Sequence, residues 1–397
     1  MTVLKNELKK IFTLKSIIIL LMITGIMYKI FIIPQSQVIS RSHIIENIVI
    51  DMINDYGNSM DEEEYLDFKG KYNEKVKIAE EHIKNNKEFS DLDIYNYEDF
   101  YKIARNDGEE KYNNPKLLDL YWGYIGSEEF PIFEELNQFE NIILCYEAIV
   151  LGIGNIHIDD SESIKMVNRK QEIKESKDIQ SLMPYTIFQE YEIQLKWVMV
   201  LILVSIIFLI SPIYLNDKKD KTIYLQYSSK LGRNLFKKKV IASMIISIVI
   251  ASLQIILFLK FYSTQNTGIF LDCKISGFFN TPIKSWYDLT FSNYIVVTII
   301  CVYILSVIVS LISMFISSKV NNYITLIGIH VPIIFIISRV LLQVLISKVT
   351  SIDITMNRIG YINMPKYSML IIYTLMILIS FVGMYYRNKK EHEYDIN

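Results

Sequence analysis

Six long runs of apolar residues divide this chain, and they constrain its fold more than any other feature. Each run approaches the roughly 20 residues that an α-helix needs to cross about 30 Å of hydrocarbon. Helices satisfy all their own backbone hydrogen bonds there. The predicted spans are residues 16–34, 196–213, 240–260, 293–316, 323–346 and 368–386. The sequence therefore predicts an all-α polytopic membrane protein with six transmembrane helices.

The charged residues separate into an acidic block and a basic remainder. Residues 35–190 hold 33 Asp or Glu against 16 Lys or Arg, whereas the rest of the chain holds 10 acids and 25 bases. The bases gather before the first span, between the second and third, and in the tail at 387–397. By the positive-inside rule, both termini then lie in the cytoplasm of a cell-membrane protein. No soluble basic domain exists, so the positive charge indicates lipid or a partner protein rather than nucleic acid.

The first 15 residues predict an amphipathic helix that lies in the cytoplasmic interface. Lys5, Lys9 and Lys10 alternate with Leu4 and Leu8 at helical spacing. No small-residue cleavage site follows the first apolar run, so we expect a retained span rather than a signal peptide.

Residues 35–190 predict a helical extracytoplasmic domain, because no apolar run in them is long enough to span a membrane. Apolar stripes at helical spacing mark its elements. The stripes cover residues 44–56, 65–83, 115–124 and 130–151, with a weaker, more polar one at 164–179.

Two features of this domain have a structural and a functional interpretation. The acidic run Asp61–Glu64 suits a helix start better than a cation site, since acids favour the first turn. The aromatic residues are interpreted as core rather than as a ligand platform; they are Tyr121, Trp122, Tyr124, Phe130 and Phe133. A second, shorter external connection at residues 261–292 also carries aromatic residues and is expected along the membrane interface.

The chain lacks the signatures of several chemistries. It has no Walker-type phosphate loop, no HExxH and no GxSxG motif. Cys145, Cys273 and Cys301 make neither a disulfide framework nor a zinc spacing, so no metal is expected. The predicted spans contain no Asp or Glu, which counts against an ion-coupled transporter.

An arginine and a histidine lie inside the fifth predicted span. Arg339 either faces a substrate path or extends to the outer interface, and the second interpretation is favoured. His330, beside Pro332, is interpreted as a satisfied histidine in a kinked helix.

The segment 214–239 joins the second and third spans and carries eight Lys or Arg but only two acids. Its apolar residues Tyr224, Tyr227 and Leu231 recur at helical spacing. A basic amphipathic helix between two spans belongs to the cytoplasmic side, where we expect it to dock a cytosolic partner.

In this arrangement the chain resembles permeases of the ABC-2 export type. That family has an interfacial first helix, six spans and a cytoplasmic coupling helix between spans two and three, and some members carry a large outer domain after span one. Its loop motif has acids, Gly-Thr, an apolar run, Ser-Thr-Pro and Ser-Arg. The matching residues here are Asp217, Asp220, Thr222, the run 223–227, Ser228, Ser229, Gly232 and Arg233. Lys221 stands where the family has Gly, and Lys230 where it has Pro.

The resemblance implies a permease subunit with no active site of its own. A separate cytosolic ABC ATPase would bind ATP and Mg²⁺ and seat on the coupling helix, and a second permease copy, identical or different, would complete the path. The coupling residues implied are Asp217, Asp220, Thr222, Tyr224, Tyr227, Leu231 and Arg233. The cargo of such an exporter would be a peptide, a lipid or a drug-like molecule.

An alternative from another class is a non-transporting membrane sensor whose outer domain binds a ligand. An intramembrane enzyme is disfavoured, because the spans hold no cluster of catalytic side chains.

Overall fold

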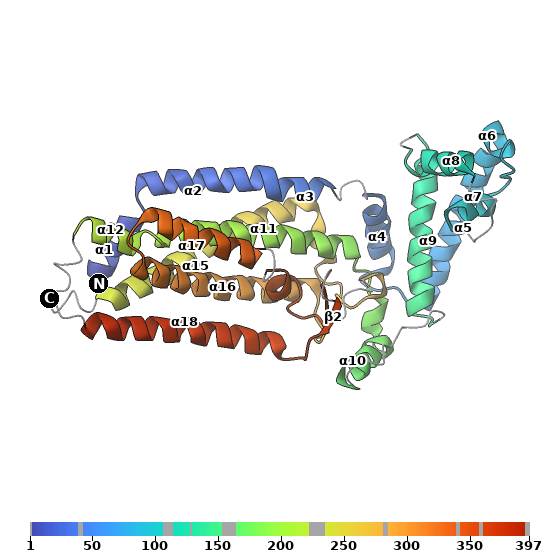
Figure 1. The fold of residues 1–397 in the computed structure, drawn as a ribbon. Coiled ribbons are helices and arrows are strands. Elements are labelled where there is room, and N and C mark those ends of the chain that lie inside the picture. Colours follow the sequence, from blue (N-terminus) through green and yellow to red (C-terminus); the bar gives the residue numbers. More distant parts are fainter. Residues whose placement is uncertain are drawn as a thin grey trace. The chain divides into compact units, whose positions relative to one another are not determined.

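The computed structural model describes residues 2–38, 43–105, 114–127, 129–152, 164–221, 235–280, 285–338, 342–356 and 360–393. These residues form two compact units. The first comprises Met1–Val38, Thr186–Gly268 and Lys284–Asn397, and the second comprises Ile39–Tyr185 and Ile269–Ile283. The regular structure is mainly helical, as predicted (Figure 1). Within the described ranges, the one exception is an antiparallel pair of strands, β1 (Asp353–Met356) and β2 (Gly360–Asn363), which pairs Asp353 with Asn363.

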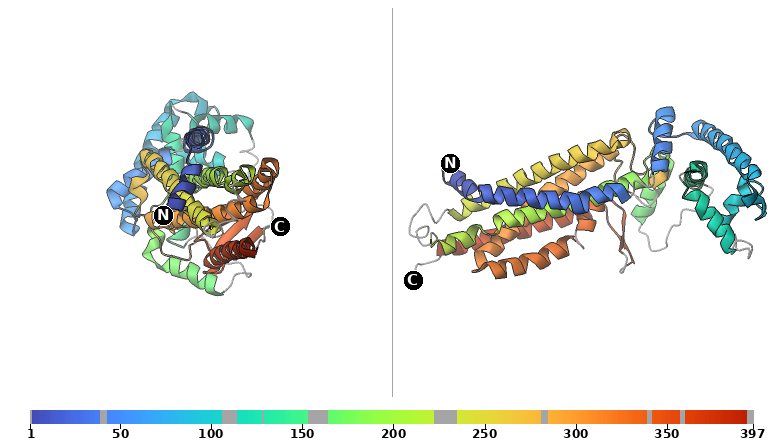
Figure 2. Two further views of the ribbon diagram at one scale, coloured as in Figure 1. Left: turned by 90° about the vertical axis from the view of Figure 1, so that its left-hand side faces the viewer. Right: turned by 90° about the horizontal axis from the view of Figure 1, so that it is seen from above.

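The first unit contains the apolar helices. Within the described part, five continuous helical stretches are long and apolar enough to cross a membrane: Leu14–Gln35, Tyr185–Lys219, Leu235–Gln265, Phe291–Lys319 and Ser368–Lys389. Their main elements are α2 (Leu14–Met27), α11 (Tyr185–Ile210), α12 (Ile213–Lys219), α15 (Leu235–Tyr262), α16 (Phe291–Lys319) and α18 (Ser368–Glu393). The long helices run side by side in all views (Figures 1 and 2). These helices indicate a multi-pass membrane protein.

The apolar helices differ in how much the protein covers them. In α11, 78% of the most apolar stretch is buried, whereas the corresponding value for the α2 stretch is 6%. Leu21 of α2 is 65% exposed. A helix that is apolar on all sides and uncovered by protein is suited to hydrocarbon. We therefore assign α11 to the centre of the bundle and α2 to its lipid-facing edge.

The start of the chain folds as two helices with a break between them. The first, α1, runs from Thr2 to Ile11. Thr13 then caps α2: its hydroxyl accepts from the Ser16 amide, and the Ser16 hydroxyl accepts from the Thr13 amide. This reciprocal cap begins the apolar helix at Leu14 rather than at the predicted residue 16. A π-helical turn (Tyr28–Ile32) and α3 (Ile33–Val38) complete the stretch.

The described residues of the fifth predicted span include two helical pieces, on either side of residues 339–341, which lie outside the described ranges. α17 runs from Tyr323 to Ile336 and contains Pro332, and a separate π-helical turn covers Gln343–Ser347. Pro332 does not end the helix, because α17 continues past it to Ile336. His330 is satisfied, as predicted: its Nδ1 lies 2.8 Å from the Leu326 carbonyl and its Nε2 3.1 Å from the Ser313 hydroxyl.

The second unit is built from the predicted stripes. Its helices are α4 (His43–Tyr56), α5 (Glu62–Asn85), α6 (Lys87–Ser90), α7 (Tyr97–Arg105), α8 (Pro115–Ile125), α9 (Pro131–Ile149) and α10 (Ile164–Glu175). The acidic run is a helix start, as predicted. The Asp61 carboxylate accepts from the amides of Glu63 and Glu64 at 3.0 Å, and the Glu64 carboxylate accepts from the Asp61 amide at 2.8 Å. The short helices α6 and α7 were not predicted.

Stacked aromatic rings join α5 to α9. The ring centroids of Tyr65 and Tyr146 lie 4.4 Å apart, and those of Phe68 and Phe139 lie 4.7 Å apart. The predicted aromatic core is correct for the buried side chains of Tyr121, Tyr124 and Phe133. It is wrong for Trp122, which is 66% exposed, because this residue lies on the outer face of α8.

A distant segment completes the second unit. Residues 269–283, part of the predicted second external connection, belong to it. The Lys274 amide donates to the Ser181 hydroxyl at 2.8 Å, and the Phe278 ring packs edge-on against Tyr146 at 5.2 Å. Gly277 lies so close to the Ser181 backbone that a Cβ there would meet the Ser181 carbonyl carbon at 2.9 Å. Only glycine fits such an approach.

Candidate functional site

The polar contacts of the first unit concentrate where several helix ends meet. We call this region the helix-end junction and define it by Lys10, Asp217, Lys218, Lys239 and Ser318. These residues come from α1, α12, α15 and α16. They therefore connect the start of the chain to the segment between the second and third apolar helices.

Asp217 is the centre of the junction. It lies on α12, a short helix that continues α11 after Ser211 and Pro212, and it is only 5% exposed. One carboxylate oxygen pairs with the ammonium of Lys239, and the other lies 3.3 Å from the ammonium of Lys10. A single carboxylate thus joins α12 to both α15 and α1.

Lys239 is buried far more deeply than a lysine usually is. It is 1% exposed, on the face of α15 that also buries Leu235. Its ammonium lies 4.5 Å from the centre of the Tyr214 ring, in addition to its contact with Asp217. A buried charge is tolerated only when it is paired and hydrogen-bonded, so Asp217 and the Tyr214 ring together make this position possible.

Lys10 forms the outer side of the same cluster. Its ammonium is 3.2 Å from the Glu7 carboxylate, and its side chain is 53% exposed. Partial burial works to lower the pKa of Lys10, but the carboxylates of Asp217 and Glu7 outweigh burial and raise that pKa above its ordinary value. Lys10 therefore stays protonated and holds α1 against α12.

The end of α16 is held by two cations. The Lys218 ammonium donates to the carbonyls of Ser318 (3.3 Å) and Val320 (2.9 Å), and so neutralises the negative end of this helix. Arg387 of α18 donates from Nε to the Ser318 hydroxyl at 3.1 Å. The Tyr323 hydroxyl, at the start of α17, donates to the Asn216 side chain of α12. The ends of α16, α17 and α18 therefore belong to the junction as well.

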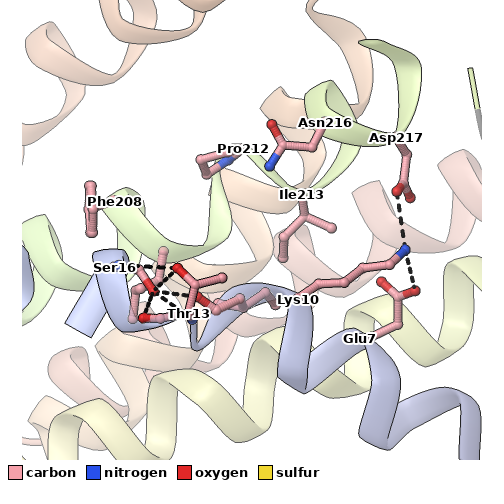
Figure 3. Close-up of a pocket in the computed structure, with 11 residues that line it drawn as sticks. Glu7, Lys10, Thr13, Ser16, Phe208, Pro212, Ile213, Asn216 and Asp217 are labelled. Carbon is pink, nitrogen blue, oxygen red and sulfur yellow. Dashed lines mark hydrogen bonds and ion pairs between the residues drawn. The ribbon is translucent and has the colours of Figure 1, made fainter. Parts of the chain in front are cut away.

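A pocket of about 230 Å³ opens beside the junction (Figure 3). The polar side chains of Lys10, Thr13, Ser16 and Asn216 face apolar groups of α11 and the following turn. Its full lining is Glu7, Lys10, Ile11, Thr13, Ser16, Phe208, Leu209, Pro212, Ile213, Asn216 and Asp217. The pocket lies between α1 and the end of α11, beside the ion pair that joins Lys10 of α1 to Asp217 of α12.

The structure places only two of the predicted coupling residues. Asp217 is buried in the junction, whereas Asp220 is exposed at the end of α12. Thr222, Tyr224, Tyr227, Leu231 and Arg233 lie outside the described residues, as does Arg339. The predicted segment 214–239 is not one element: α12 covers its start, and α15 already begins at Leu235. No helix breaker lies between Leu235 and Val240, so the apolar helix extends through the three lysines.

The backbone at Lys221 has a special conformation. Its φ of +56° lies in the left-handed region, directly after the end of α12. Side chains with a Cβ pay a steric cost there, and glycine does not. Lys221 is the position where the ABC-2 loop motif has glycine.

The helix that contains the second predicted span begins earlier than the span itself. α11 begins at Tyr185, so the apolar stretch that continues to Lys219 includes Glu190 and Glu192. The Tyr294 hydroxyl of α16 donates to the Glu192 carboxylate at 2.8 Å. The hydropathy pattern placed the start of this span at residue 196 and therefore missed both acids.

The junction is a network of ion pairs and hydrogen bonds between helix ends. Among the residues that the structure describes, no three His, Cys, Asp or Glu side chains come together as a metal site, and the three cysteines are free. The sequence did not predict the helix-end junction as a group, because Lys10, Asp217 and Lys239 lie far apart in the sequence. One local feature of the sequence could have indicated the buried lysine. Lys239 follows Leu235 by one helical turn, on the face of α15 that is buried.

Comparisons of this chain with family models, with curated proteins and with solved structures find no match.

Proposed function

We propose that this chain is the permease subunit of an ATP-driven exporter of the ABC-2 type. The observation that carries the proposal is the position of Asp217. A partner that pulls on the segment after α12 acts on α11 directly, on α15 through Lys239 and on α1 through Lys10. The segment is therefore connected to two apolar helices, α11 and α15, and to the amphipathic α1, as a coupling element for a separate ATPase requires. The left-handed backbone at Lys221 also supports the motif match, because the family has glycine there.

Contacts between helix ends support six crossings, with both termini on one side. Arg387 near the end of α18 meets Ser318 near the end of α16, so these two helices run toward the same end. The chain between them must return to the other end. Tyr323 contacts Asn216 at the junction, whereas the Leu345 carbonyl accepts from Tyr373 near the start of α18 at 2.6 Å. Residues 323–346 thus make the return, and we assign them as the fifth span.

The orientation follows from charge. The junction and its neighbours carry Lys9, Lys10, Lys218, Lys238 and Lys319, with further bases along the same helix ends. The positive-inside rule assigns this end to the cytoplasm and the second unit to the outside. The ATPase would then approach from the cytoplasm and contact residues 222–234 of the coupling segment.

The test is co-purification of the tagged chain from its native membrane in mild detergent, followed by mass spectrometry. We expect an ABC-type ATPase, and we expect Tyr227→Asp or Arg233→Glu to remove it. Trp122→Asp and Lys165→Glu are matched controls, because both residues are exposed in the second unit. If no ATPase is recovered with the unaltered chain, the permease proposal fails and the sensor alternative replaces it. An ATPase that stays bound to both coupling-segment variants would reject this docking site alone.

A further inference from the structure

The second unit contains a pocket that the proposed transport function does not use. It has a volume of about 590 Å³ and lies between α6 and α8. Glu88 and Asp91 line it from α6 and its end, and Asp119, Gly123 and Tyr124 line it from α8. Phe130, just before α9, completes the wall. This volume falls in the range of small-molecule sites, roughly 300–1,000 Å³.

The pocket is electronegative. Three carboxylates face one ammonium, that of Lys116. Two separate elements supply the acids, so the charge surrounds the opening instead of lying on one helix face. In the described part of the chain, no ion pair joins Glu88, Asp91 or Asp119 to a basic residue. A cationic group that enters would therefore meet three carboxylates that form no ion pair, with the Lys116 ammonium as the one cation of the lining.

Aromatic rings form the apolar side of the pocket. The ring centroids of Tyr124 and Phe130 lie 5.4 Å apart, and His82 packs against Phe130 at 4.3 Å. The Tyr124 hydroxyl accepts from the Asn86 amide nitrogen at 2.8 Å, which holds the ring in place. Aromatic faces attract cations as well as apolar groups, so rings beside carboxylates favour an organic cation.

Gly123 keeps the pocket open on the α8 side. No atom lies within 4 Å of the position that its Cβ would occupy. Glycine is unfavourable inside a helix, and its φ here is not one that requires glycine. The packing thus offers no structural reason for glycine at this position, whereas a side chain there would enter the pocket.

We propose that this pocket binds an organic cation in which an ammonium or guanidinium group is joined to an aromatic or aliphatic group. The carboxylates of Glu88, Asp91 and Asp119 would hold the charge, and the half-buried Phe130 would hold the apolar part. A metal ion is a poorer occupant, since the described residues contain no group of three ligands close enough to coordinate one. The site is independent of the permease assignment.

The test uses the full chain in lipid nanodiscs and 2-(4-fluorophenyl)ethylammonium as the probe. Binding is measured by ¹⁹F NMR line broadening, with 3-(4-fluorophenyl)propionate as the anion of similar shape. We expect the cation to bind and the anion to bind at least about tenfold more weakly. Gly123→Leu should abolish binding of the cation, because its side chain fills the space beside Tyr124. Asp119→Asn combined with Glu88→Gln should weaken binding by about tenfold or more.

Two controls separate the pocket from general effects. Gly70→Leu places the same side chain at an exposed glycine of α5 that also has no atom within 4 Å of its Cβ position. Glu74→Gln removes one exposed acid elsewhere on the same helix. Both should bind the probe as the unaltered chain does. Equal binding of cation and anion, or unchanged binding by Gly123→Leu, would overturn the proposal.

Discussion

The buried contact between Asp217 and Lys239 leads to a quantitative prediction for Asp217→Asn. Asparagine keeps the size of the side chain but removes the charge that compensates a lysine of 1% exposure. Breaking a buried ion pair from one side costs about 3–5 kcal/mol, because the remaining charge loses its counter-ion. The contact to Lys10 contributes less than about 1 kcal/mol, since that side chain is 53% exposed. For a unit of this size, the melting temperature should fall by roughly 10 °C.

A buried cysteine allows this effect to be measured in the first unit alone. Cys301 lies on α16 and is 6% exposed, so a thiol-reactive dye labels it only after unfolding. Replacing Cys145 and Cys273 by serine removes the signal of the second unit. The labelling rate is then followed against temperature in nanodiscs. Asp220→Asn, at the exposed end of α12, is the matched control and should melt within about 2 °C of the parent.

A second variant tests whether the lost charge pair causes the lower melting temperature. Asp217→Asn with Lys239→Met removes both charges and should recover most of the lost stability, because a buried pair can often be replaced by apolar groups without loss. Two results would refute the reasoning. One is a melting temperature of Asp217→Asn within about 2 °C of the parent. The other is a double variant that melts as low as Asp217→Asn alone, since a buried unpaired charge would then not explain the loss.

Three further predictions concern single positions. Gly277→Ala should destabilise the second unit by about 2–4 kcal/mol, because the new Cβ collides with the Ser181 backbone. Limited proteolysis would detect the loss of stability, and unchanged resistance to the protease would contradict the prediction. The Tyr65 hydroxyl holds the pKa of the Glu147 carboxyl below its ordinary value, so this contact stabilises the fold above the ordinary carboxyl pKa and stops doing so as the pH falls through the lower, folded-state pKa. Glu147→Gln should therefore reduce the loss of stability at acid pH in a series of denaturation curves. A pH dependence parallel to that of the unaltered chain would contradict this prediction. Lys221→Gly should raise stability by about 1 kcal/mol in the dye-labelling melt, whereas a loss would show that the left-handed backbone carries no strain.

Periodic patterns predicted most of the helices. The stripes at residues 65–83 and 130–151 became α5 and α9, because a helix that buries one face must repeat its apolar residues with the period of the helix. The ends of the helices were harder to predict from the sequence. α11 starts before the predicted span, since Glu190 and Glu192 lower the hydropathy without breaking the helix. Hydropathy reports the cost of placing residues in hydrocarbon, whereas the end of a helix depends on backbone hydrogen bonds and caps.

The helix-end junction was beyond prediction from local patterns. Asp217 and Lys239 are 22 residues apart, and Lys10 is 207 residues from Asp217. Their contacts exist only after the helices have packed together. Each residue taken alone belongs to a basic segment and is expected to face solvent. The sequence therefore predicted where charge collects but not which acid is buried.

The second unit has a consequence for how the chain is made. Residues 269–283 complete it, yet they follow Tyr185 only after α11 and α15 have been synthesised. At about 5–20 residues per second, a ribosome needs roughly 4–17 seconds to reach this segment. During that interval Ser181 lacks its contact with Lys274, and Tyr146 lacks its contact with Phe278. The second unit therefore stays incomplete while two apolar helices enter the membrane. A truncated product that ends before Ile269 would expose the surface of the second unit that residues 269–283 normally cover. Cellular quality control could then recognise a chain whose membrane insertion had stopped halfway.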